Sequence, residues 1–248
     1  MIAPVLGVVR ADWPVGGDIQ GLCTERSGGY SQPPFDSLNL GDHCGDDPRH
    51  VARNREHLAR QLHLPAAPRW LEQVHGSRCV TWAGGAARRA RADAAYTRQR
   101  GEVLAILTAD CLPVLLASDD GVELAAAHGG WRGLLGGVLE SALAPFSAPP
   151  GRIHAWLGPA IGPTAFQVGT EVRTAFVDRD PAHAGAFVPD HEGRWRCDIY
   201  RLARHILACA GVASVSGGTH CTVDEAARFY SYRREGRTGR MATLLWRR

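Results

Sequence analysis

The chain has 248 residues, of which 45% are hydrophobic and 21% charged, so it can bury a large core and is neither disordered nor fibrous. The formal charge of +3 includes no long run of one sign, so neither a nucleic acid nor a membrane surface is an expected partner. The chain contains no lysine, which excludes Schiff-base chemistry, pyridoxal phosphate anchoring and the phosphate loop of NTPases.

The strand and helix signals of the first 82 residues surround one long loop. Residues 25–47 are rich in glycine, proline and polar side chains, which is typical of a binding loop. Asp47 followed by Pro48 predicts the start of a helix that ends before Pro65. The remaining pattern predicts strands over residues 5–9, 19–23, 70–74 and 79–82.

The middle of the chain carries the most apolar segments. Residues 103–107 and 113–117 are continuously apolar, which is typical of strands in the middle of a covered sheet, and residues 122–127 predict a further strand. A helix is expected over residues 131–144. Polar residues interrupt or end these strands, which is where α/β proteins place their ligands.

The last hundred residues again mix strands and helices. Strands are predicted over residues 153–157, 228–232 and 242–246, and helices over 170–176 and 198–210. In the second of these helices, Ile199, Leu202, Ile206 and Cys209 share one apolar stripe. Because no repeat and no linker appears, the whole chain, 1–248, is predicted to be a single α/β domain with more than one layer of sheet.

Seven cysteines, an odd number without any CxxC pair, favour reduced thiols over a disulfide framework. The first ten residues are too weakly apolar for a signal peptide, and no stretch approaches the length of a membrane span. We therefore expect a soluble cytoplasmic protein with a small-molecule partner.

Three residues suggest a metal site. His75, Cys111 and His128 each lie near the end of a predicted strand, beside glycine or a polar residue. Two imidazoles and a thiolate suit zinc, and three protein ligands leave a position for water. The spacing is not diagnostic, and buried cysteine with solvent-facing histidines is the ordinary alternative.

The same residues admit a different chemistry. Cys111 and His128 are candidates for the catalytic pair of a thiol hydrolase, with Asp110, Gln73 or Asn54 orienting the imidazole. Other templates fail, because the chain has no HExxH, no deaminase-type HxE with PCxxC, and no GxSxG.

Arginines are the only fixed cations that the chain offers to an anionic group. Four of them lie in glycine, serine or asparagine contexts and are candidates for a phosphate site: Arg26, Arg55, Arg132 and Arg233. Each is individually more typical of a surface arginine, so the hypothesis requires that they converge on one pocket.

Several of these segments together resemble the YfiH-like family, also described as laccase-domain or polyphenol oxidase proteins and regarded as purine nucleoside phosphorylases. The resemblance covers about residues 21 to 245, and Tyr30 departs from its usual pattern. It rests on RSGGYS, LNLGDHCGDDP, EQVHG, RADA, TADCLPVLL, AHGGWRG, LGPAIGP and FYSYRREGRTGRMA.

The resemblance implies a fold of α/β/β/α layers and a zinc site formed by His75, Cys111 and His128. It also implies phosphorolysis of adenosine, inosine and S-methyl-5'-thioadenosine to the base and a ribose 1-phosphate, with adenosine deaminase activity. Phosphate attack on the anomeric carbon is expected to pass through an oxocarbenium-like state, with Arg55 and Arg233 holding the phosphate. Asp110 is expected to move protons or to orient the metal site.

Three alternatives stay open at this point. One is a Cys111/His128 thiol hydrolase, and another is a non-catalytic protein stabilised by zinc. The third is a copper-dependent polyphenol oxidase, which the absence of any HxH pair makes a poor fit because a trinuclear copper cluster needs such pairs. Copper binding in vitro is nonetheless expected, since copper exceeds zinc in affinity for nitrogen and sulfur ligands.

Overall fold

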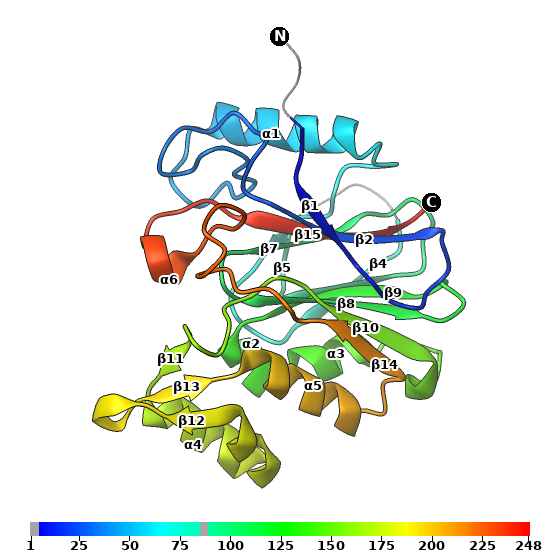
Figure 1. Cartoon of the computed structure of the whole chain (residues 1–248). Helices are drawn as coiled ribbons and strands as arrows, with labels where there is room; N and C mark the ends of the chain where they lie inside the picture. The colour runs from blue at the N-terminus through cyan, green and yellow to red at the C-terminus, as the bar shows by residue number, and fades with distance from the viewer. Residues whose placement is uncertain (1–4, 85–88) are drawn as a thin grey trace.

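The computed structural model describes residues 5–84 and 89–248 of the chain. A four-stranded and a six-stranded β-sheet are stacked face to face, and helical structure covers the outer face of each (Figure 1). This order of layers confirms the predicted α/β/β/α fold. Within the described ranges, no helix combines the length and apolarity needed to cross a bilayer.

The upper sheet in Figure 1 is antiparallel throughout and has the strand order β1-β2-β15-β7. Its strands are β1 (Val8–Arg10), β2 (Ile19–Thr24), β15 (Met241–Arg247) and β7 (Leu104–Thr108). Helix α1 (Pro48–Gln61) covers its outer face. Asp47 is its N-cap, and the Asp47 side chain accepts a hydrogen bond from the Arg49 N–H. The predicted helix start is therefore confirmed.

The lower sheet is mixed and has the strand order β14-β10-β8-β9-β6-β4. Its strands are β14 (Ser214–Gly217), β10 (Ile153–Leu157), β8 (Leu112–Ser118), β9 (Leu124–Gly129), β6 (Ala94–Thr97) and β4 (Cys79–Trp82). All residues of β8 and β9 are buried, and for β8 the continuous apolar run predicts this.

Alternation along the strands divides the core between the layers. In β7, Leu104 and Ile106 pack between the sheets, whereas Ala105 and Leu107 pack toward α1. In β8, Leu115 joins the core between the sheets, whereas Val114 faces the helices on the other side.

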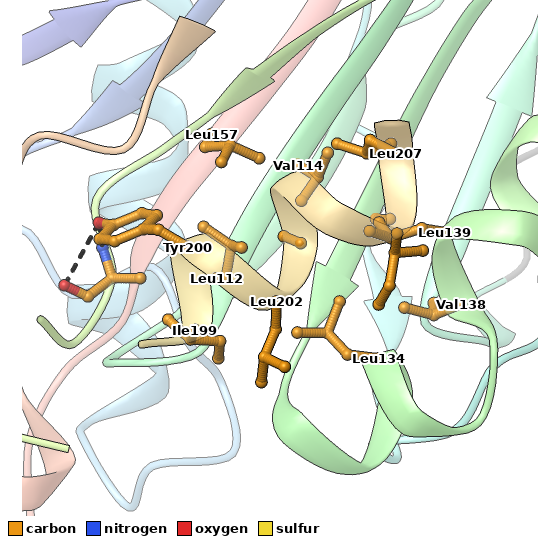
Figure 2. Close-up of a cluster of buried hydrophobic side chains, with 14 of the residues drawn as sticks. Leu112, Val114, Leu134, Val138, Leu139, Leu157, Ile199, Tyr200, Leu202 and Leu207 are labelled. Atoms are coloured by element: carbon orange, nitrogen blue, oxygen red, sulfur yellow. Dashed lines mark hydrogen bonds between the residues drawn. The ribbon is translucent and has the colours of Figure 1, made fainter. Parts of the chain in front are cut away.

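Helices α2 (Trp131–Leu135), α3 (Val138–Leu143) and α5 (Ile199–Cys209) cover the lower sheet. Figure 2 shows their leucines packing against Leu112, Val114 and Leu157 of the sheet. The Tyr200 hydroxyl accepts a hydrogen bond from the Ala160 N–H, 2.7 Å away, and so ties α5 to the loop after β10.

The remaining elements are short and lie around these layers. Strands β11 (Gln167–Val168), β13 (Trp195–Cys197) and β12 (Phe187–Pro189) form a small sheet beside α4 (Thr170–Arg179). Strands β3 (Leu71–Glu72) and β5 (Ala90–Arg91) pair with each other, and α6 (Tyr232–Glu235) lies near the C-terminal end. The described residues also include short 3-10 helices: η1 (Pro150–Arg152), η2 (Pro181–Ala186) and η3 (His191–Gly193).

Several predictions of local structure differ from what the structure shows, and the strand expected over 5–9 is found at Val8–Arg10. Residues 228–231 form no strand, and α6 begins at Tyr232, because Ser231 caps that short helix. The expected helix over 131–144 is two helices, since Gly137 adopts a φ of +88° between them. The strand expected over 70–74 is limited to Leu71–Glu72, and Cys209 is exposed, outside the buried stripe of α5.

Candidate metal centre and adjoining cavity

His75, Cys111 and His128 come together although they lie on three separate segments. One possible ligand atom from each residue lies within 4.8 Å of the other two. His128 is near the end of β9, and Cys111 immediately precedes β8. These two strands are paired with each other in the lower sheet. The two imidazole rings meet edge to face, with centroids 4.8 Å apart. The predicted grouping of these three side chains is therefore present in the structure.

His75 is held in an unusual backbone conformation by a buried carboxylate. Its φ is +60°, a value that residues other than glycine rarely adopt. The Asp93 carboxylate accepts hydrogen bonds from the N–H groups of Val74, His75 and Gly76, at 3.1, 2.9 and 2.7 Å. Three successive N–H groups pointing at one carboxylate fix this loop and aim the His75 ring at the cluster.

Asp93 also orients the second imidazole. Its Oδ1 lies 2.8 Å from Nδ1 of His128, which leaves Nε2 of His128 for the cluster. Orientation of a ligating histidine by a buried carboxylate is a common feature of metal sites. The expectation that Asp110, Gln73 or Asn54 performs this task is wrong. Asn54 instead bonds to Ser31 and to the carbonyl of Asn39.

Cys111 lies where the chain crosses from the upper sheet to the lower one, between β7 and β8. Its Sγ lies 3.8 Å from Nε2 of His75. Gly130 leaves room for this arrangement, because a Cβ there would come within 3.2 Å of the Cys111 sulfur. The turn therefore presents the thiol to both histidines.

Asp110 in the same turn links three parts of the chain. Its φ is +91°, and its carboxylate accepts hydrogen bonds from the Thr222 hydroxyl and the Arg233 N–H, each at 2.6 Å. Its backbone carbonyl accepts from the Ile161 N–H. Both carboxylate oxygens are thus engaged in holding the C-terminal segment against the cavity.

The electrostatics of the cluster favour charge on its side chains. Burial opposes ionisation of the Cys111 thiol, but the charge of His128 and hydrogen bonds from both histidines outweigh it and lower the pKa of Cys111 to about 6. Burial likewise opposes protonation of His128, but the Cys111 thiolate and the Asp93 carboxylate raise the pKa of His128 to about 9. A thiolate beside imidazoles attracts a soft or borderline cation.

A cavity of about 480 Å³ opens beside the cluster. This volume is within the usual range of small-molecule sites. Its lining includes both apolar and charged or polar side chains, among them the following residues: His43, Leu107, Asp110, Trp131, Ile161, Phe166, Ile199, Tyr232, Arg233 and Arg240.

The four candidate phosphate arginines do not converge on this cavity. Arg233 alone of the four lines it, and its Nη1 donates to the carbonyls of Ala165 and Gln167. The others have partners elsewhere: Arg26 bonds to Glu235, Arg55 to the Leu40 carbonyl and the Trp70 ring, and Arg132 stacks on Trp131.

The structure adds residues that the sequence analysis did not select. Arg240 and His43 both line the cavity, so Arg240 joins Arg233 as a second guanidinium group there. Asp93 lies within the segment RADA, where its only sequence signal is a lone acidic residue before an apolar strand. Tyr30 packs against α1, with the Arg53 guanidinium 3.6 Å from its ring centre, and is not among the residues that line the cavity.

Comparison with known proteins gives a match over nearly the whole chain. The family model described as multi-copper polyphenol oxidoreductase laccase matches residues 20–248. Purine nucleoside phosphorylase YfiH of Escherichia coli is 50% identical, with 96% of this chain and 98% of that protein covered. A purine nucleoside phosphorylase of Pseudomonas aeruginosa is also 50% identical, covering 95% and 96%.

Solved structures agree with this match. A Neisseria meningitidis protein superposes with a TM-score of 0.94 at 46% identity, covering 97% of this chain and 99% of that one. YlmD from Geobacillus stearothermophilus superposes with a TM-score of 0.90 at 31% identity, covering 98% and 96%. These similarities extend over all four layers of the fold.

Proposed function

Because the chain belongs to the family described as multi-copper polyphenol oxidoreductase laccase, with relatives named purine nucleoside phosphorylases, we propose that it is a purine nucleoside phosphorylase. The proposed substrates are adenosine, inosine and S-methyl-5'-thioadenosine, which phosphate splits to the base and a ribose 1-phosphate. We propose adenosine deamination as a second activity. The observation that carries this proposal is a His2Cys cluster at the wall of a cavity that also presents arginines.

The donor set of the cluster fits zinc. Two imidazole nitrogens and one sulfur are typical zinc ligands, and three protein ligands leave one position for water. His75, Cys111 and His128 would hold the ion. When bound, zinc would lower the pKa of a ligated water to about 7 and stabilise developing negative charge.

Two kinds of side chain in the cavity lining suit the two substrates of the reaction. Phe166, Ile161 and Trp131 offer apolar and aromatic surface to a purine base. Arg233 and Arg240 offer guanidinium groups to phosphate, and their donors suit its oxygens. Holding the nucleophile and the nucleoside together lowers the entropic part of the barrier, and a phosphate held beside the sugar places its negative charge where an oxocarbenium-like state develops positive charge.

Asp110 acts in this proposal as a positioning residue. Its two carboxylate oxygens hold Thr222 and the backbone of Arg233, so its charge fixes the segment that carries the phosphate-binding arginine. We therefore propose a positioning role for Asp110 in place of proton transfer, since both of its carboxylate oxygens already accept hydrogen bonds.

Replacing Arg233 by alanine is expected to weaken phosphate binding by about 1.5 to 3 kcal/mol, since a charged hydrogen bond is lost. The measurement is the apparent KM for phosphate in inosine phosphorolysis. Arg55→Ala is the matched control, because Arg55 packs on Trp70 and is not among the cavity-lining residues. Equal phosphate KM values for Arg233→Ala and the unsubstituted protein would show that another group binds the phosphate.

One observation favours a second candidate function, a thiol hydrolase. Asp93 bonds to Nδ1 of His128, and His128 lowers the pKa of Cys111, which is the order of groups in a Cys-His-Asp relay. Chelation separates the two functions. A zinc phosphorylase should lose activity when its metal is stripped and regain it with one equivalent of zinc, whereas a thiol hydrolase should become more active when stripped.

A further inference from the structure

A second group of metal-ligating side chains lies away from the cavity. Asp180 follows the last residue of α4, and His205 and Cys209 lie one turn apart near the end of α5. One possible ligand atom from each lies within 4.8 Å of the other two. None of the three lines the cavity described above. Figure 1 shows α4 and α5 in the lower part of the molecule, and η2 packs against both of them.

The contacts within this group distinguish a metal site from a catalytic relay. Nε2 of His205 lies 2.7 Å from Oδ2 of Asp180 and 3.5 Å from Sγ of Cys209. A relay needs the carboxylate on one ring nitrogen and the thiol on the other, as in the Ser-His-Asp arrangement. Here the carboxylate and the thiol both approach the same nitrogen. Three donor atoms converging on one point is the geometry of ligands around an ion.

The distances fit a tetrahedral ion. Zinc–sulfur and zinc–nitrogen bonds of about 2.3 and 2.0–2.1 Å at a tetrahedral angle place the two ligand atoms roughly 3.5 Å apart. The Cys209 and His205 atoms already have this separation. The Asp180 oxygen forms a direct hydrogen bond with His205, so it needs to move back by only about 0.6 Å to share a tetrahedral ion with the imidazole.

The surroundings hold two of the ligands in place. Oδ1 of Asp180 accepts a hydrogen bond from the Ala182 N–H at 2.9 Å, which leaves Oδ2 for the cluster. His205 and Cys209 lie four residues apart on α5, which places them on one helix face. Ligands that are already ordered lose little entropy when an ion binds.

A buried histidine beside the group is an independent observation. His183 is 4% exposed, and its ring meets the His205 ring edge to face with centroids 4.9 Å apart. Its Nδ1–H donates to the Phe176 carbonyl at 2.9 Å, so Nε2 carries the lone pair. Within residues 5–84 and 89–248, that Nε2 has no hydrogen-bond partner. A buried acceptor without a partner calls for an ordered water or an ion nearby.

We propose that Asp180, His205 and Cys209 bind a divalent ion of the zinc class at a second site, separate from the cavity. Three protein ligands leave the fourth position to water, and the Nε2 lone pair of His183 accepts a hydrogen bond from that water. The ion would join the end of α4 and η2 to α5, so its effect is on stability rather than on the reaction.

Cobalt titration tests this site, because a cobalt–thiolate bond adds a charge-transfer absorption band. Stoichiometry is measured for the unsubstituted protein, for Cys209→Ser and for Cys79→Ser, a control at a half-buried cysteine of β4. Cys209→Ser is expected to bind one equivalent less than the other two. Loss of a direct ligand should reduce affinity by more than the roughly 10- to 100-fold that an outer partner contributes.

A Cys111→Ala protein keeps this test independent of the proposed function. If the second site exists, Cys111→Ala still binds one equivalent of cobalt with a thiolate band, and adding Cys209→Ser or His205→Gln removes it. Zinc should also raise the unfolding temperature of Cys111→Ala and not that of the double variant, because ligands that bind the native state stabilise it. Equal cobalt stoichiometry in Cys209→Ser, His205→Gln and Cys79→Ser would overturn the proposal.

Discussion

Replacing Cys111 by alanine is expected to abolish both metal binding at the cavity and phosphorolysis, while the protein stays folded. The thiolate is the only anionic member of the three-residue cluster, so its loss removes the charge that balances a divalent ion. Cys111 is half-buried in a turn between β7 and β8, outside the strands that form the core. The free energy of unfolding without metal should therefore fall by no more than about 2 kcal/mol.

The control for this variant is Cys79→Ala, at a cysteine of similar burial on β4 that is not part of the cluster. It should bind zinc at the cavity and phosphorolyse inosine like the unsubstituted protein. Calorimetric zinc titration, steady-state kinetics and urea unfolding of both variants provide the comparison. Normal phosphorolysis by Cys111→Ala stripped of metal would contradict both the zinc and the thiol mechanisms.

Replacing Asp93 by asparagine is expected to weaken both the metal centre and the fold. The carboxylate is fully buried and accepts hydrogen bonds from three backbone N–H groups and from His128. The asparagine amide has the same shape, but its NH2 group is a donor and would face some of these donors in place of an acceptor oxygen. Removing one partner of a buried charge pair costs about 3 to 5 kcal/mol, and losing the carboxylate behind a ligating histidine reduces metal affinity about 10- to 100-fold.

The pH dependence of stability provides a second measure of Asp93. Burial opposes ionisation of Asp93, but the hydrogen bonds from His128 and from the backbone outweigh it and hold its pKa below the usual value. Such a group stabilises the fold above its unfolded pKa, and this stability is lost as the pH falls through the lower folded pKa. Asp93→Asn should therefore lose less stability on acidification than the unsubstituted protein, as followed by urea unfolding between pH 7 and 3. If both proteins lose the same stability between pH 7 and 3, the Asp93 carboxylate contributes through its shape and not through its charge.

The parts of the fold with a strong periodic signal are predictable from the sequence. The apolar runs of β7 and β8 specify buried strands, and Asp47 with Pro48 specifies the start of α1. Prediction fails where the residue types of a segment are compatible with more than one backbone conformation. The sequence does not predict strand β6, because its alanines are equally compatible with a helix, and residues 229–231 are buried without forming a strand.

The candidate site likewise contains residues that the sequence identifies and residues that it does not. The three cluster residues lie at the ends of predicted strands, so their residue types and positions identify them. Asp93 and Arg240 do not have such a signal, since the role of Asp93 depends on contacts across 17 or more residues of sequence and that of Arg240 on which side chains face the cavity. Arg55 illustrates the reverse case, because a suitable residue type in a suitable motif packs instead on Trp70.

The most direct test of the central claim is phosphate-dependent release of hypoxanthine from inosine, measured on one metal-free preparation divided into zinc-loaded and copper-loaded halves. Oxygen uptake with a phenol is followed in parallel. The zinc half is predicted to release hypoxanthine and ribose 1-phosphate in equal amounts, only when phosphate is present, and to take up no oxygen, because zinc has no redox chemistry. Efficient oxygen reduction by the copper half together with no phosphorolysis by the zinc half would contradict the account and indicate an oxidase.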